Sequence, residues 1–119
     1  MLRFKNGDLR LVLEEAKANG CKILLVKDHG VYMMSAIGEK DDRGTHKRLA
    51  YAIGCNPNVD DSDAWWDTAR LEFGGDDFVE RFDVTDPVFE AILNGTDDLL
   101  VSATETHIQL ETAAPLSPT

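Results

Sequence analysis

The fold class is decided by the stretch Lys22-Ile23-Leu24-Leu25-Val26-Lys27-Asp28-His29-Gly30-Val31-Tyr32-Met33-Met34-Ser35-Ala36. Its two halves, residues 22–27 and 31–36, are rich in β-branched, aromatic and long apolar side chains, a composition that favours strands. Between them, Asp28-His29-Gly30 suits a three-residue loop with glycine in the left-handed position. The stretch therefore predicts a β-hairpin.

A helix is predicted before the hairpin. Asp8 is a plausible N-cap, and Asn19-Gly20 supplies a C-terminal stop. Between these signals, apolar residues recur at helical spacing: Leu9, Val12, Leu13 and Ala16. Arg10 and Glu14 are four residues apart on the solvent side of this helix. The short run at residues 2–5 is a candidate edge strand.

After the hairpin, the polar residues 38–45 predict an exposed loop and residues 47–53 a third strand. The sequence Gly54-Cys55-Asn56-Pro57-Asn58 ends that strand. A second helix is capped by Asp61 or Ser62, ends at Gly74, and carries one apolar face made of Trp65, Trp66, Ala69 and Phe73. Residues 78–82 fit either a short strand or a helical turn.

The C-terminal part predicts one more helix and one or two strands. Asp86-Pro87 opens the helix, Asn94-Gly95 closes it, and its apolar face holds Phe89, Ile92 and Leu93. In residues 99–103 and 107–110, apolar side chains alternate with polar ones as in strands. The apolar positions change from odd to even numbers near Glu105, which implies a bulge or a hairpin turn there. This order of elements predicts a single small α+β domain over residues 1–112, with an antiparallel sheet and two to three helices packed on it, followed by a disordered tail over residues 113–119.

Composition limits the classes of protein to which the chain can belong. With 119 residues and 43% apolar content it can bury one independent core. No apolar run exceeds five residues, so neither a signal peptide nor a membrane span is expected, and the two cysteines fit no metal-ligand spacing. We expect a cytoplasmic protein with reduced thiols, no membrane association and no cofactor.

Charge is divided unevenly along the chain. Residues 1–50 carry ten basic and seven acidic side chains, whereas residues 51–119 carry two basic and fifteen acidic ones, which gives the overall net charge of −10. Within residues 60–98, thirteen carboxylates accompany only Arg70 and Arg81, a local charge of −11. Such a field repels nucleic-acid phosphates and attracts basic protein surfaces. A basic protein partner is therefore favoured, and direct binding of nucleic acid is not.

Some of these acids have a structural role available. Asp61 and Asp86 are candidate helix caps, and Trp65 and Trp66 are more typical of core anchors than of an exposed platform. The residues left for a partner-binding site are Asp67, Arg70, Glu72, Asp76, Asp77, Glu80 and Asp83.

A second hypothesis is a small-molecule site or small enzyme around Trp66, Arg70, Asp76 and Asp77, where an aromatic wall, one cation and carboxylates would line a pocket. Because adjacent carboxylates usually diverge, a solvated turn after a glycine cap is the favoured interpretation of Gly74-Gly75-Asp76-Asp77. Enzymatic activity is left open, and a non-enzymatic protein is preferred. Homo-oligomer formation is also left open.

Metal and nucleophile motifs are weak. Residues 56–67 resemble a calcium loop only in part, because Asp61 stands where the loop needs glycine and Asn56 replaces the first aspartate. His29, His46 and His107 share no short spacing, and a triad of Cys55, His107 and an aspartate would have to assemble in space. No metal site is predicted.

Two stretches carry a resemblance to a known family: Ala50-Tyr51-Ala52-Ile53-Gly54-Cys55-Asn56-Pro57, and Ala64-Trp65-Trp66-Asp67 with Arg70 and Phe73-Gly74-Gly75-Asp76-Asp77. Leu9-Arg10 and Gly30-Val31-Tyr32-Met33-Met34-Ser35 are also similar. The chain resembles, over most of residues 1–110, a bacterial family of small proteins classified only as a domain of unknown function. The resemblance implies a setting on plasmids, phages and other mobile elements, and it implies no activity and no catalytic residues.

Overall fold

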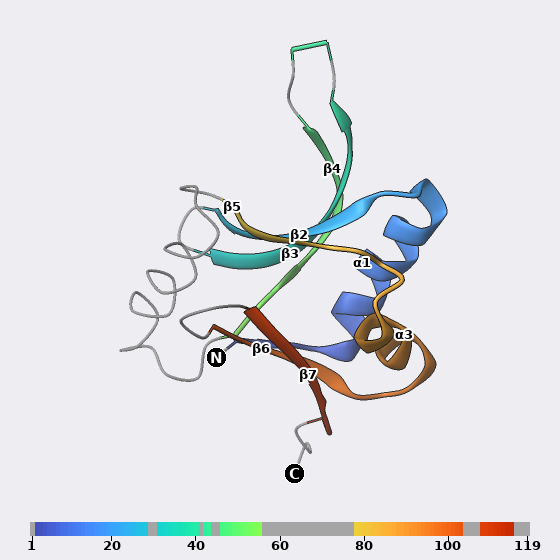
Figure 1. The fold of residues 1–119 in the computed structure, drawn as a ribbon, viewed down its shortest axis with the longest axis vertical. Helices are drawn as coiled ribbons and strands as arrows, with labels where there is room; N and C mark the ends of the chain where they lie inside the picture. Colours follow the sequence, from blue (N-terminus) through green and yellow to red (C-terminus); the bar gives the residue numbers. More distant parts are fainter. Residues whose placement is uncertain are drawn as a thin grey trace.

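Two antiparallel sheets form the framework of the molecule in a computed structural model (Figure 1). The structure describes residues 2–28, 31–40, 42–43, 46–55, 78–103 and 108–115, with the backbone alone described at residues 27, 28, 39, 40, 46, 78–80 and 103. The first sheet has the strand order β4-β3-β2-β5, and the second has the order β1-β6-β7. The predicted α+β class is confirmed, with the strands divided between two sheets.

The predicted hairpin is confirmed as β2 (Lys22–Asp28) and β3 (Val31–Lys40). β4 (His46–Ile53) pairs with β3 and begins one residue earlier than predicted, whereas β3 extends to Lys40, into the predicted loop at residues 38–45. The ambiguous segment is strand β5 (Phe78–Phe82), which pairs with β2. These pairings make β2 and β3 the two central strands of the first sheet.

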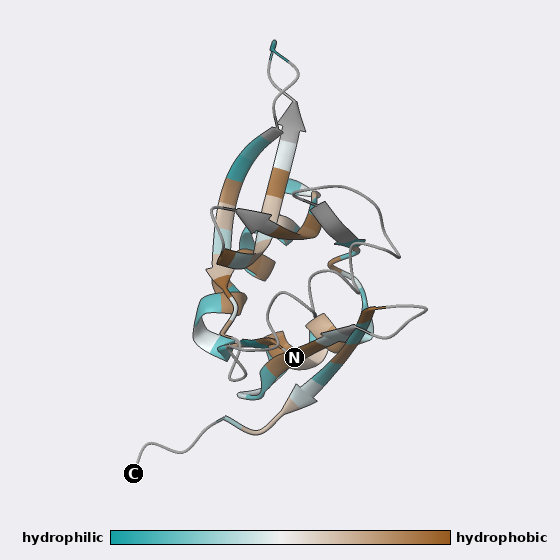
Figure 2. Cartoon of the chain, turned by 90° about the vertical axis from the view of Figure 1, so that its left-hand side faces the viewer, coloured by the Kyte–Doolittle hydropathy of each residue, from teal (hydrophilic) through white to brown (hydrophobic). Residues whose placement is uncertain are grey.

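Register decides which side chains of the first sheet face the core. Leu25 of β2 pairs with Met34 of β3, and both are fully buried. One residue away in the same register, Leu24 pairs with Ser35 on the opposite face. The buried positions on the core face are Ile23, Leu25, Tyr32, Met34, Ala36 and Ala52. Figure 2 shows the resulting mixture of hydrophobic and hydrophilic positions along the strands.

α1 (Asn6–Asn19) covers the core face of this sheet and packs against β2, β3 and β4. Its buried side is the predicted stripe, and Gly20 ends it in the left-handed conformation with φ of 62°. The prediction that Asp8 is the N-cap is wrong, because the helix begins two residues before it. The first amide is satisfied from a distant strand instead: Asp98 Oδ1 accepts a hydrogen bond from the Asn6 N–H at 2.9 Å.

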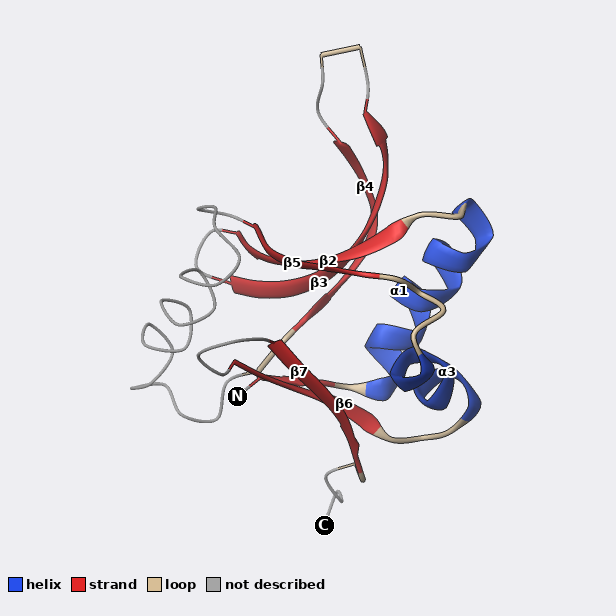
Figure 3. Cartoon of the chain, viewed as in Figure 1, coloured by secondary structure: helices blue, strands red, loops and turns tan. Residues whose placement is uncertain are grey.

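α3 (Pro87–Asn94) lies beside α1, on the same side of the two sheets (Figure 3). As predicted, Asp86 caps it, since its side chain accepts a hydrogen bond from the Val88 N–H. At the other end, Arg10 of α1 donates from Nη1 to the Leu93 carbonyl oxygen at 2.7 Å. Arg10 thus stabilises the negative C-terminal end of α3, a role that its predicted place on the solvent side of α1 did not indicate.

The second sheet closes the core. β1 (Leu2–Phe4) pairs with β6 (Asp98–Ala103), and β6 pairs with β7 (Ile108–Ala113). The change of parity near Glu105 thus corresponds to a hairpin, whose turn at residues 104–107 lies outside the described residues. β1 is an edge strand in this order, as predicted, and its outer side is joined to the first sheet by two hydrogen bonds between Arg3 and Cys55.

Within the described ranges, no helix has the length and apolar character that crossing a membrane requires.

Candidate functional site

The predicted partner-binding residues are only partly visible. Asp67, Arg70, Glu72, Asp76 and Asp77 lie outside the described residues, as do both tryptophans, the partial calcium loop, His29 and His107. Glu80 lies on β5, where the backbone alone is described. Their grouping into one surface, and the alternative small-molecule site around Trp66, therefore stay predictions.

Asp83 is described, and it lies directly after β5. The pairing of Ile23 with Phe82 places Lys22 opposite Asp83, and Lys22 Nζ is 2.7 Å from Asp83 Oδ2. The other carboxylate oxygen accepts hydrogen bonds from the Thr85 N–H at 3.0 Å and the Thr85 hydroxyl at 2.8 Å. The Lys22 ammonium, together with these two donors, holds the pKa of the Asp83 carboxyl well below its usual range. Asp83 therefore stabilises the turn into α3.

Asp98 is the buried acidic residue in the part of the chain that the structure describes. It is 5% exposed, and its Oδ2 is 2.7 Å from Arg3 Nη1 while Oδ1 accepts the Asn6 N–H. A carboxylate this well buried needs a cation and hydrogen-bond donors, and Asp98 has both. It therefore joins β1, β6 and the start of α1.

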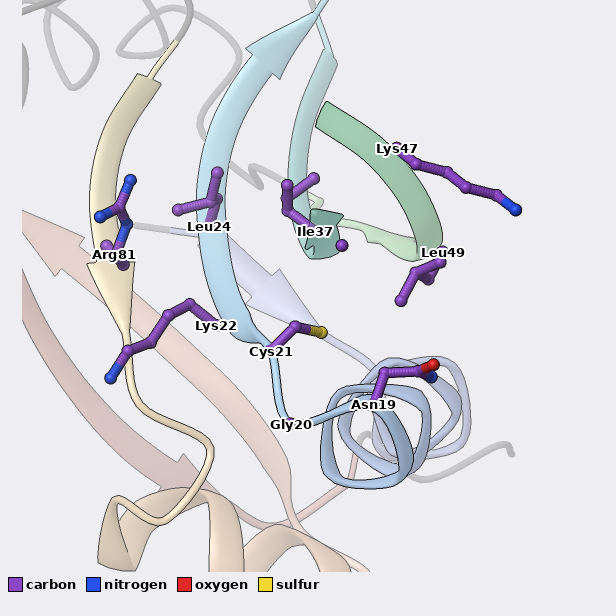
Figure 4. A pocket seen from close by; sticks show the side chains of 10 residues that line it. Asn19, Gly20, Cys21, Lys22, Leu24, Ile37, Lys47, Leu49 and Arg81 are labelled. Carbon is purple, nitrogen blue, oxygen red and sulfur yellow. The ribbon is translucent and has the colours of Figure 1, made fainter. Parts of the chain in front are cut away.

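A groove of about 620 Å³ opens where the end of α1 meets the first sheet (Figure 4). It lies on the face of the sheet that carries Leu24, away from the core face. Its lining is contributed by α1, all four strands of the sheet and the turn between α1 and β2: Asn19, Gly20, Cys21, Lys22, Leu24, Ile37, Gly38, Lys47, Leu49 and Arg81. The groove thus combines apolar side chains with three cationic ones.

The apolar part of the groove comes from three neighbouring strands. Leu24, Ile37 and Leu49 are half-buried, and Leu49 packs on Gly38, where an added Cβ would lie 3.5 Å from its side chain. The register of β3 and β4 shifts between Ala36 and Ile37. Ala36 pairs with Ala50 and Ile37 with Arg48, so Leu49 lies at this irregularity of the pairing. The apolar lining is therefore a product of sheet pairing.

Cys21 points its sulfur toward the space between Asn19 and Leu49 (Figure 4). Burial raises the pKa of the Cys21 thiol, and the Glu15 carboxylate raises it further. Backbone hydrogen bonds act in the opposite direction without cancelling the effect. The thiol is thus protonated at neutral pH, which makes it a poor nucleophile.

Ser35 belongs to the same face of the sheet as Leu24, with which it pairs. It is fully buried, and its Oγ has no hydrogen-bond partner within the described part of the chain. A buried hydroxyl without a partner costs free energy, so Ser35 is expected to lower the stability of the fold.

Both cysteines are free thiols, Cys21 half-buried and Cys55 exposed. Across the described ranges, no group of three or more His, Cys, Asp or Glu side chains could hold a metal ion. The lining of the groove was not predicted, because its cations are separated by 25 and 34 positions in the sequence. One signal in the sequence could have found part of it. Side chains alternate along a strand, so Lys22 and Leu24 lie on the face opposite to the core.

The described residues form a small α+β domain with a groove of about 620 Å³ where the end of α1 meets the first sheet. The chain belongs to the family described as Protein of unknown function (DUF3085), whose model matches residues 21–111. The comparisons with curated proteins and with solved structures found no match. The resemblance to a family of unknown function is thus confirmed, while the setting on mobile elements stays a prediction. The matched range includes eight of the ten groove residues, all except Asn19 and Gly20.

Proposed function

We propose that the protein is a non-enzymatic interaction protein that presents the acidic segment at residues 60–98 to a basic surface on a partner protein. The observation that carries this proposal is the surplus of carboxylates after those with a role in the fold are set aside. Among the described residues, Asp83, Asp86, Glu90 and Asp98 are bound to groups of the chain itself. Nine carboxylates and two arginines remain in the segment, a charge of −7.

A charge of this size attracts an oppositely charged protein before the two proteins touch. Carboxylates at close spacing substitute for phosphates, and a negative field steers the protein toward grooves lined by lysine and arginine. A basic partner that itself binds nucleic acid has such a groove. The role of a mobile-element accessory or host-defence inhibitor, which would use this chemistry, is part of the proposal and is supported by the resemblance alone.

The free thiols support a cytoplasmic location as part of the same proposal. Reducing compartments keep cysteines unpaired, and both cysteines of this chain are free.

The test compares two triple variants of equal charge. In the first, Glu72→Gln, Asp76→Asn and Asp77→Asn neutralise the predicted site. In the second, Glu14→Gln, Asp42→Asn and Glu111→Gln neutralise three exposed carboxylates elsewhere. Each variant changes the net charge by the same amount, so a difference in partner binding between them shows that the position of the carboxylates matters.

Both variants and the parent chain are used for affinity capture from the native host at low salt, followed by a salt titration of the bound protein. We expect the parent and the second variant to retain a partner that the first variant loses. Release of the partner should follow ionic strength, because the Debye length falls to about 8 Å at physiological salt. No captured partner at low salt, or equal loss in both variants, would contradict the proposal.

A further inference from the structure

Three dipeptides of the chain join an asparagine to a glycine: Asn6-Gly7, Asn19-Gly20 and Asn94-Gly95. Asparagine is a thermolabile residue, and a following glycine makes its side-chain amide reactive, because glycine has no Cβ to hinder the approach of the next backbone nitrogen. The dipeptides are the same in sequence, so their surroundings in the fold decide which asparagine reacts.

Asn6 is held firmly between the two helices. It is half-buried, and its Nδ2 donates hydrogen bonds to the carbonyl oxygens of Asp97 at 2.7 Å and Ile92 at 3.0 Å. A reaction at Cγ of Asn6 requires the side chain to leave both acceptors, which costs the fold two hydrogen bonds. Asn6 is therefore protected.

Asn19 is exposed, and the groups that would react there are already hydrogen-bonded. The Gly20 N–H, which would have to attack, donates to the carbonyl oxygens of Ala16 and Lys17 at the end of α1. Asn19 Nδ2, which would have to leave, donates to the Glu15 carbonyl oxygen at 2.8 Å and to Glu15 Oε1 at 3.1 Å. These bonds slow the reaction without burying the site.

Asn94 has neither kind of protection. It is the last residue of α3 and is exposed, and its side chain makes no hydrogen bond to the described part of the chain. Gly95 is extended, with φ of −136° and ψ of −160°, and among the described residues its N–H makes no capping bond like that of Gly20. Asn6 and Arg10 donate to carbonyl oxygens on either side of Asn94, which leaves the Asn94 amide and the Gly95 N–H available.

We propose that Asn94 is a site of spontaneous covalent modification, at which the side-chain amide is lost and the main chain is converted in part to isoaspartate. The Gly95 amide nitrogen gives its proton to water and attacks Cγ of Asn94. The new N–Cγ bond closes a five-membered succinimide ring, while the Cγ–Nδ2 bond breaks and the nitrogen leaves as ammonia.

One water molecule then opens the ring. Cleavage of the N–Cγ bond gives aspartate, and cleavage of the bond between the same nitrogen and the main-chain carbonyl carbon gives isoaspartate, in which the main chain is longer by one carbon. Either product adds a carboxylate at the C-terminal end of α3, where negative charge is unfavourable. The longer main chain also displaces the Gly95 carbonyl oxygen, which accepts hydrogen bonds from Asn6 and Arg10 of α1. The modification therefore loosens the contact between α1 and α3, and this inference does not depend on the proposed function.

The first experiment follows the three sites in the full chain, incubated at mildly alkaline pH with and without denaturing urea. Cleavage after lysine and arginine places the sites on separate peptides, residues 6–10, 18–22 and 82–119, and mass spectrometry measures the amide lost from each. In the folded chain, Asn94 should react at least about tenfold faster than Asn6 and about threefold faster than Asn19. In urea the three rates should become similar. Equal rates in the folded chain, or a faster reaction at Asn6 or Asn19, would overturn the inference.

The second experiment tests the effect on the fold with an Asn94→Gln variant, whose longer side chain closes the corresponding ring far more slowly. Parent and variant are incubated together and then unfolded in urea. The parent should lose urea midpoint in proportion to the isoaspartate formed at position 94, whereas the variant should keep its midpoint. An equal loss in both chains, or an unchanged midpoint in a parent chain converted at Asn94, would refute the assigned effect on the contact between α1 and α3.

Discussion

Replacing Gly54 by alanine tests how the two sheets are joined. Gly54 follows β4, donates its N–H to the Tyr32 carbonyl oxygen at 2.8 Å, and precedes Cys55, which is hydrogen-bonded to Arg3 of the other sheet. A Cβ at Gly54 would lie 2.7 Å from Cζ of Phe4 and 3.0 Å from Cε1. Phe4 is fully buried, so its ring has little freedom to move away.

The expected cost follows from that overlap. Carbon atoms in contact prefer a separation of about 3.5–4.0 Å, so the alanine methyl group is too close by about 0.8 Å. Overpacking of this kind in a filled core costs typically about 1–3 kcal/mol. Since small domains have a total stability of about 5–15 kcal/mol, the Gly54→Ala variant should still fold and should unfold at lower urea concentration.

The assay is urea unfolding followed by circular dichroism, with a double-mutant cycle. Phe4→Leu removes part of the ring, so Gly54→Ala in that background should cost less by about 1 kcal/mol than in the parent chain. Gly7→Ala is the matched control, because nothing lies within 4 Å of its added Cβ and alanine favours the helix, so this variant should gain up to about 1 kcal/mol. A neutral Gly54→Ala variant, or strictly additive effects in the cycle, would refute the reasoning.

Three further predictions concern polar groups of the described structure. Asp98→Ala should lower the free energy of unfolding by about 3 kcal/mol in urea titrations, since it leaves the guanidinium of Arg3, with 20% of its side chain exposed, without its carboxylate; a loss under about 1 kcal/mol would contradict the role assigned to this pair. Ser35→Ala should raise the free energy of unfolding by about 1 kcal/mol by removing a buried hydroxyl that has no partner among the described residues, and a lower melting temperature would mean that this hydroxyl is hydrogen-bonded. Asp83→Asn should destabilise the protein at neutral pH through loss of the contact with Lys22. Because the pKa of Asp83 is lowered on folding, its stabilising effect is present above the ordinary carboxyl value of roughly 4 and is lost as the pH falls from there toward the folded pKa. Urea midpoints of the parent and variant should therefore converge in acid, and a constant difference would exclude this linkage.

Much of the local structure was predictable because its signals are close together in the sequence. The hairpin of β2 and β3, the left-handed Gly20 and the Asp86 cap each depend on residues within a few positions of one another. Such features follow from backbone sterics and short-range hydrogen bonds, which a sequence displays directly.

Errors arose where a distant residue replaced a local one. Asp8 has the right chemistry for an N-cap, yet the carboxylate that receives the first amide of α1 belongs to Asp98, more than ninety positions away. Arg10 was expected on the solvent side of α1, and it reaches instead the end of α3, at Leu93. In both cases a tertiary contact of a charged group with helix ends outweighs the local preference.

The candidate site shows the same division. The surplus of acid in residues 60–98 is a property of composition, and the groove is not, since its cations Lys22, Lys47 and Arg81 lie on three strands. Only the order β4-β3-β2-β5 brings those strands into one sheet. No periodicity in the sequence displays that order, because the pairing of strands far apart depends on the packing of the whole core.

The sequence by itself determined the class of fold, the identity of most elements and the sign of the charge, because strand and helix periodicity, caps and net charge are local or additive properties. The tertiary structure alone decided that the strands form two sheets, that Gly54 lies against Phe4 where they meet, and that an apolar groove with a cationic rim opens beside α1. These features depend on contacts between residues far apart in the chain, whose free energy is gained only when the core closes around them.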